Sequence, residues 1–130
     1  MYNKFLETGE QGYHPLRKIK VCLSGLRYAM HYDFSVAYKI YLSIGILIVS
    51  FLMRQWIDAL FIMAATALVL IAEMFNSAIE ALCDFIETKE NHKIKVIKDI
   101  SAAAAGISIL LWTVVLLVEF SQLWRFYFQG

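Results

Sequence analysis

The chain has 130 residues, a formal net charge of +1 and a hydrophobic fraction of 60%. Its mean hydropathy is +0.60, whereas a soluble globular domain carries about 45–50% apolar residues. One domain of this length cannot bury so much apolar surface in water, so the composition excludes an ordinary soluble domain. The near-zero net charge also argues against nucleic acid as a partner. We therefore expect an integral membrane protein made of a single domain, residues 1–130.

The N-terminal region predicts a helix lying on the membrane surface over residues 14–31. The polar residues that precede it, 1–12, contain no apolar stretch, so we expect no cleavable signal peptide. Pro15 suits the first turn of a helix. Apolar side chains then recur every three or four positions with basic side chains beside or opposite them, a pattern typical of a membrane surface. Packing against protein is the alternative. The apolar positions are Leu16, Ile19, Leu23, Leu26 and Met30, and the basic ones include Arg17, Lys18 and Lys20.

Three apolar segments follow, and they predict transmembrane helices over residues 34–53, 59–84 and 100–118. Each reaches the ~20 residues that cross a bilayer. A short polar turn separates the first two segments, and a longer polar loop over 87–99 separates the last two. The predicted fold class is thus all-α: a surface helix followed by three spans.

The basic residues predict the orientation of the chain in the membrane. Most of them lie either before the first span or between the second and third spans, and these two regions fall on the same side. The positive-inside rule therefore places the N-terminus and the long loop in the cytoplasm, and the C-terminus outside. The residues concerned are Lys4, Arg17, Lys18, Lys20, Arg27, Lys89, Lys93, Lys95 and Lys98, against Arg54 and Arg125 on the other side.

The second span carries a stripe of polar residues. At roughly 100° per residue, all its members fall within about 100° of one another around the helix. An acidic residue at the centre of a spanning helix costs ~2.5–3.5 kcal/mol on insertion scales, so such residues indicate a function. The stripe consists of Glu73, Asn76, Ser77, Glu80 and Asp84.

Depth divides the stripe into two parts. Glu73 lies roughly 10 Å deeper than Glu80, because a helix rises ~1.5 Å per residue. Glu80 and Asp84 lie near the negative C-terminal end of the span, where a bound cation would relieve their repulsion. Oxygen ligands without His or Cys favour Mg²⁺. Asp33, at the start of the first span, has the position to complete such a site.

The start of the third span offers a place for phosphate. Lys98 precedes the apolar segment directly, and we expect the first backbone N–H groups of that helix beside it. A Mg²⁺ site facing a phosphate site indicates binding of a magnesium nucleotide. No Walker A or kinase glycine-rich loop is present in the sequence. From the residues alone, three alternatives stay open: a packing hydrogen bond within a bundle, a proton relay of a transport subunit, and a non-catalytic partner in a larger membrane complex.

The segment from Glu73 to Asp84, with the sequence EMFNSAIEALCD, resembles the signature of the prokaryotic diacylglycerol kinase family, which includes the undecaprenol kinases. Lys98-Asp99, followed by a run of small residues, matches a second block of the family. Gly25-Leu26 with an acid at Asp33 matches a third. The similarity extends from about His14 to Val118, and its Asn-Ser-Ala-Ile-Glu-Ala core is highly specific.

The resemblance implies a homotrimeric lipid kinase of the bacterial inner membrane that transfers the γ-phosphoryl group of MgATP to a lipid hydroxyl. Diacylglycerol is the expected acceptor, and undecaprenol is the alternative. The family pattern has Glu at the position of Asp33, and a Glu-Tyr-His loop where this chain has residues 89–92. The implied roles are catalytic base for Glu73; metal binding for Asp33 and Glu80; ATP binding for Asp33, Asn76, Glu80, Asp84, Lys98 and Asp99; and substrate binding for Glu73 and Arg27.

Overall fold

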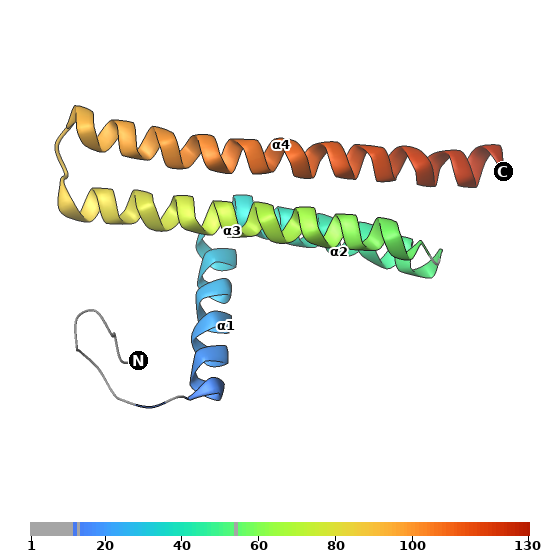
Figure 1. Ribbon diagram of the computed structural model, residues 1–130, viewed down its shortest axis with the longest axis horizontal. Coiled ribbons are helices and arrows are strands. Elements are labelled where there is room, and N and C mark those ends of the chain that lie inside the picture. Colours follow the sequence, from blue (N-terminus) through green and yellow to red (C-terminus); the bar gives the residue numbers. More distant parts are fainter. Residues whose placement is uncertain (1–11, 13, 54) are drawn as a thin grey trace.

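The computed structural model describes residue 12, residues 14–53 and residues 55–130, and within them it contains four α-helices. The N-terminal residues 1–12, in which we expect no signal peptide, lie outside the described residues except for Gly12, and Arg54 lies outside them too. Three helices run side by side as a long bundle, and the first runs crosswise to them (Figure 1). The helices are α1 (Pro15–Tyr32), α2 (Phe34–Leu52), α3 (Trp56–Ile86) and α4 (His92–Gln129).

Asp33 alone separates the crosswise helix α1 from α2. Its backbone is extended, with φ −117° and ψ 102°, which ends α1 and turns the chain. Its side chain then accepts a hydrogen bond from the backbone N–H of Ser35 at 2.9 Å and so caps α2. Pro15 stands at the start of α1, as expected for a residue that lacks an N–H to pair. The sharp corner therefore follows from one extended, capping residue.

The apolar segments predicted from the sequence lie within helices except for Met53, which follows the end of α2, but α4 extends further toward its N-terminus than expected. It begins at His92, so most of the segment predicted as a loop over 87–99 is helical. Asn91 accepts a hydrogen bond from Lys93 N at 2.9 Å and caps the helix at that point. The first free N–H groups of α4 therefore lie near His92 and not beside Lys98, so the predicted pairing of Lys98 with a helix N-terminus is wrong.

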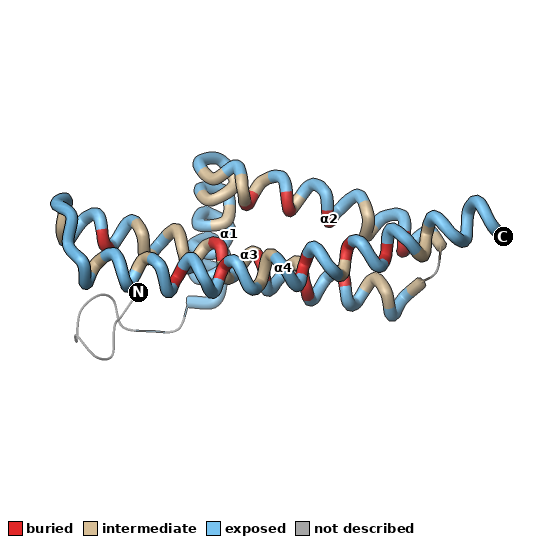
Figure 2. The backbone as a smooth tube through the Cα atoms, turned by 90° about the horizontal axis from the view of Figure 1, so that it is seen from above, coloured by how far each residue is buried: buried red, intermediate tan, exposed pale blue. Residues whose placement is uncertain are grey.

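Helices α2, α3 and α4 are each long and apolar enough to cross a membrane. Figure 2 shows that many residues of the bundle are exposed and that the buried residues lie where helices face one another. Large apolar side chains such as Phe75, Ile107 and Leu117 are exposed around the bundle. A continuous apolar surface of this kind requires lipid or further protein around it. Within α1, whose residues are all described, no residue is buried.

The apolar core joins α3 to α4. Its buried members are Ile62, Ala65, Val69, Trp112 and Leu116. Apolar burial does not drive association of helices inside a bilayer, so close packing and hydrogen bonds between helices must hold the bundle together.

One buried hydrogen bond connects α2 to α4. The indole Nε1 of Trp112 donates to Ser43 Oγ of α2 at 2.9 Å. Such interhelical bonds contribute on average about 0.6 kcal/mol in membrane proteins.

Candidate active site

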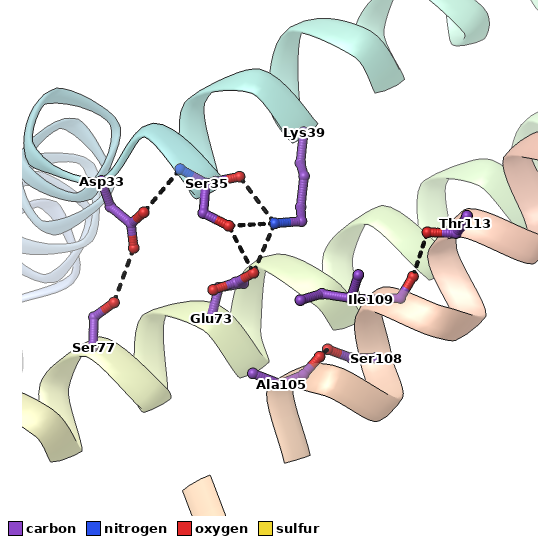
Figure 3. Close-up of polar contacts among 9 residues, drawn as sticks. All are labelled: Asp33, Ser35, Lys39, Glu73, Ser77, Ala105, Ser108, Ile109 and Thr113. Carbon is purple, nitrogen blue, oxygen red and sulfur yellow. Dashed lines mark hydrogen bonds and ion pairs between the residues drawn. The ribbon is translucent and has the colours of Figure 1, made fainter. Parts of the chain in front are cut away.

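The most deeply buried ion pair among the described residues joins α2 to α3. Lys39 Nζ donates to Glu73 Oε1 at 2.7 Å, and the two side chains are 1% and 8% exposed. The Ser35 hydroxyl donates to the same Oε1 at 2.9 Å. Lys39 also donates to the Ser35 carbonyl oxygen at 3.1 Å and to the Ser35 hydroxyl oxygen, so all three of its N–H groups are used (Figure 3). We call Ser35, Lys39 and Glu73 the inner triad.

A second contact fastens the corner between α1 and α2 to α3. Asp33 Oδ2 accepts a hydrogen bond from the Ser77 hydroxyl at 3.0 Å, while Oδ1 caps α2 (Figure 3). Ser77 lies one turn along α3 from Glu73. The corner therefore brings Asp33 beside the polar stripe that the sequence predicts on this helix, although Asp33 and Ser77 are 44 residues apart in the chain.

Beyond the corner, the stripe turns toward α4. Asn76 Oδ1 accepts a hydrogen bond from the Ser101 hydroxyl at 2.8 Å, and Asn76 Nδ2 donates to Glu80 Oε1 at 3.2 Å. Ser101 also donates to the Lys98 carbonyl oxygen at 2.9 Å. The Asn76 amide thus joins the two helices and at the same time holds the carboxylate of Glu80.

An ion pair stands at the end of the stripe. Lys98 Nζ contacts Asp84 Oδ1 at 2.7 Å, and their side chains are 34% and 67% exposed. Asp99 pairs instead with Lys95 at 2.6 Å on the surface of α4. These groups line a pocket of about 730 Å³ beside the loop between α3 and α4, together with loop residues from Glu87 to His92. Three of the predicted ATP-binding residues, Asp84, Lys98 and Asp99, therefore lie around one pocket.

Two carboxylates near this end of α3, those of Asp33 and Glu80, are ligands of the kind that Mg²⁺ takes. Ser77, which contacts Asp33, precedes Glu80 by three residues, so this contact lies about 4.5 Å from Glu80 along the axis of α3. Among the described residues, no group of three or more His, Cys, Asp or Glu side chains is placed to hold a metal. Mg²⁺ typically takes only one or two carboxylates, with phosphates and water completing its shell.

Arg27 is placed apart from the other predicted site residues. It lies on the exposed surface of α1, where it lines a separate groove with Tyr28, His31 and Tyr41. Among the contacts of the described residues, none joins Arg27 to Glu73. Its role in substrate binding stays a prediction.

Sequence reasoning missed two members of the inner triad, Ser35 and Lys39. A signal was present, because Ser35, Lys39 and Ser43 recur at every fourth position and so share one face of α2. In the sequence, Lys39 is a single charge near the start of an apolar segment. A buried lysine in a spanning helix needs a partner, and the one acid at matching depth on the next span is Glu73.

A family comparison agrees with this geometry. The model of the prokaryotic diacylglycerol kinase family matches residues 20–120. Among curated proteins, none gives a significant match to the chain. The matched region covers most of the chain, including α2 and α3 with the entire polar stripe. The chain therefore belongs to the prokaryotic diacylglycerol kinase family, which makes it a multi-pass membrane protein of the lipid kinase class.

Proposed function

We propose that this protein phosphorylates the hydroxyl group of diacylglycerol with MgATP and forms phosphatidic acid at the cytoplasmic face of the bacterial inner membrane. The observation that carries the proposal is the inner triad, in which a buried carboxylate keeps one oxygen unbonded among the described residues. Further along α3, at the loop between α3 and α4, lie the groups that we assign to the nucleotide. Family membership supports the reaction class. Undecaprenol is the second acceptor to be tested.

Glu73 acts as the general base in this mechanism. The O–H bond of the lipid breaks, its proton passes to the free carboxylate oxygen of Glu73, and the lipid oxygen bonds to the γ-phosphorus of ATP. The bond between that phosphorus and the bridging oxygen breaks, and ADP leaves with the electron pair. A lipid hydroxyl is a weak nucleophile, and general-base catalysis contributes about 10²–10⁴-fold.

The remaining residues position the phosphates. Lys98, which lines the pocket, would break its ion pair with Asp84 and bind the phosphates of the nucleotide. Asp33 and Glu80 would hold Mg²⁺, with Asn76 orienting the Glu80 carboxylate through its amide. An ion bound there would neutralise the charge that develops on the transferred phosphoryl group. The protein's part is therefore positioning and electrostatic stabilisation, as phosphoryl transfer requires.

We further propose that the protein works as a homotrimer. Three spans leave the polar stripe poorly covered, and Asn76, Ser77 and Glu80 are only half-buried in a single chain. On α4, the small residues from Ala102 to Gly106 are exposed except for Ala105, which supports close approach of a helix from another copy. Helices of neighbouring copies would then close the site against water and lipid.

A direct assay tests the proposed reaction. The purified full-length protein, reconstituted in lipid vesicles, is given ATP labelled in its γ-phosphate, Mg²⁺, and either diacylglycerol or undecaprenol. We expect labelled phosphatidic acid, and less label in undecaprenyl phosphate. Absence of labelled lipid in both reactions, with folded protein, would refute the kinase proposal, whereas preferential labelling of undecaprenol would correct only the acceptor.

The orientation has its own test. Reporter enzymes that are active only outside the cytoplasm, fused after Gly130, should be active in cells, and the same reporters fused into the loop at Thr88 should be inactive. The opposite result would place the candidate site on the outer face, where ATP is scarce, and would contradict the proposed reaction.

A further inference from the structure

Lys39 and Ser35 place the two oxygens of the Glu73 carboxylate in different surroundings. Both donors that reach this side chain end on Oε1, and among the described residues no hydrogen bond ends on Oε2. Figure 3 shows the Lys39 ammonium and the Ser35 hydroxyl converging on the carboxylate from α2. The carboxylate can therefore not rotate without breaking two hydrogen bonds, and the oxygen left for a substrate is Oε2.

The charge of Lys39 is committed to this one carboxylate. The Lys39 side chain is fully buried, and its other two N–H groups donate hydrogen bonds to Ser35, one turn earlier in α2. The aromatic ring of Tyr38 lies 4.7 Å from Nζ and closes another side. The ammonium is therefore enclosed, and it has no free N–H with which to reach a nucleotide or a lipid headgroup.

A carboxylate buried without a counter-charge is disfavoured in its ionised form. Only the ionised form of Glu73 can accept a proton from the lipid hydroxyl. The adjacent ammonium offsets the cost of burying that charge, while the hydrogen bonds to Oε1 orient the accepting oxygen. Both effects act on Glu73 and not on the substrate.

We propose that Lys39 is a positioning residue for the kinase reaction: with Ser35, it holds Oε1 of Glu73 so that ionised Oε2 accepts the proton of the lipid alcohol. This inference rests on the proposed function, since it assigns a role relative to Glu73 as the base. It predicts that Lys39 governs the rate of the chemical step and has little influence on the binding of either substrate.

The test compares Lys39→Met and Lys39→Arg with wild-type protein in vesicles, by measuring kcat, KM for each substrate, and MgATP binding by calorimetry. Because misplacing a catalytic group by ~1 Å can cost about 100-fold, we expect Lys39→Met to lose about 10–100-fold in kcat with both KM values retained. Lys39→Arg, which keeps the charge, should recover part of this loss. Wild-type kcat in Lys39→Met would overturn the inference, whereas an inactive wild-type protein would refute the proposed function and with it the inference.

Ser43→Ala is the matched control. Ser43 lies one turn further along the same face of α2, is equally buried, and contacts Trp112 rather than Glu73. We expect this variant to retain wild-type kcat, even where its thermal stability falls. A loss of kcat equal to that of Lys39→Met would mean that any polar change on this face disturbs the reaction, which would contradict a specific role of Lys39.

Lys39→Met leaves a buried carboxylate without its partner, and this variant can therefore fail to fold. Two further variants keep the test decisive. The double variant Lys39→Met/Glu73→Gln is neutral on both sides, and it should be no slower than Glu73→Gln alone if Lys39 acts only through Glu73. A further loss in the double variant would overturn the inference. Ser35→Ala removes one donor to Oε1 and should lower kcat in the same direction as Lys39→Met, though less.

Discussion

Two glutamates are buried in this bundle, and their surroundings differ. Glu73 in α3 is 6% exposed and accepts hydrogen bonds from Lys39 and Ser35. Glu119, near the opposite end of the bundle in α4, is 4% exposed, and its Oε2 is a buried atom without a hydrogen-bond partner. Equal burial therefore does not mean an equal role.

The difference shows what a buried carboxylate needs if it is to be used in its ionised form. Glu73 has a counter-charge and an oriented oxygen, which are the properties that the proposed general base requires. Among the described residues, no ion pair or hydrogen bond gives Glu119 either of these. Burial alone marks both residues as unusual, whereas the partners identify the one suited to catalysis.

The largest effect expected from this comparison is on turnover. Glu73→Gln removes the proton acceptor but retains its shape, so we expect kcat to fall by about 10²–10⁴-fold. MgATP binding, measured by calorimetry, should change little, because Glu73 lies away from the pocket beside the loop. Glu119→Gln serves as the control and should retain turnover. Equal losses in the two variants would remove the distinction between the two acids, and lost ATP binding in Glu73→Gln would contradict its role as a base.

A smaller effect is expected on the dependence of activity on magnesium. Glu80→Gln replaces a proposed Mg²⁺ ligand by a neutral amide, so the Mg²⁺ concentration for half-maximal activity should rise at least ~10-fold, the loss seen even for groups that only support metal ligands. The measurement is a Mg²⁺ titration at fixed ATP, again with Glu119→Gln for comparison. An unchanged midpoint in Glu80→Gln would show that this carboxylate does not bind the metal.

The next effect concerns the stability that is provided by the hydrogen bond between Trp112 and Ser43, which lies between the two acids along the bundle. Trp112→Phe keeps the ring in the core but removes the hydrogen bond to Ser43 Oγ. We expect a loss of about 0.6 kcal/mol, and at most about 1.7 kcal/mol, in the free energy of unfolding in detergent. Combining this change with Ser43→Ala should cost little beyond the larger single effect. Additive losses would mean that the two side chains contribute separately.

The smallest effect is expected at Glu119 itself. Glu119→Gln retains the shape of the side chain and removes an acid that has no counter-charge among the described residues, so the free energy of unfolding should change by less than about 1 kcal/mol. Thermal unfolding in the same detergent measures this change. A large destabilisation would show that Glu119 has a partner in the assembled protein, and would make the two buried acids more alike than they are in a single chain.

Much of the fold followed from composition and pattern. Each apolar segment forms a helix, to within one residue at Met53, since a stretch of this length in lipid satisfies its backbone by forming a helix. The start of α4 was not predicted correctly, because the cap at Asn91 and the polar turns after it lie outside the apolar segment. The position of Asp33 beside α3 was expected only as proximity, and the structure shows a direct contact with Ser77.

The amino-acid sequence by itself determined that the protein crosses a membrane, that α3 carries an acidic stripe, and to which family the chain belongs. These properties depend on residue type and spacing within one segment, which the sequence shows directly. Only the tertiary structure decided that Lys39 and Ser35 of α2 bind Glu73, because the rotation of one helix against another depends on packing between residues distant in the chain. The acidic stripe is a property of one helix, whereas the inner triad requires two.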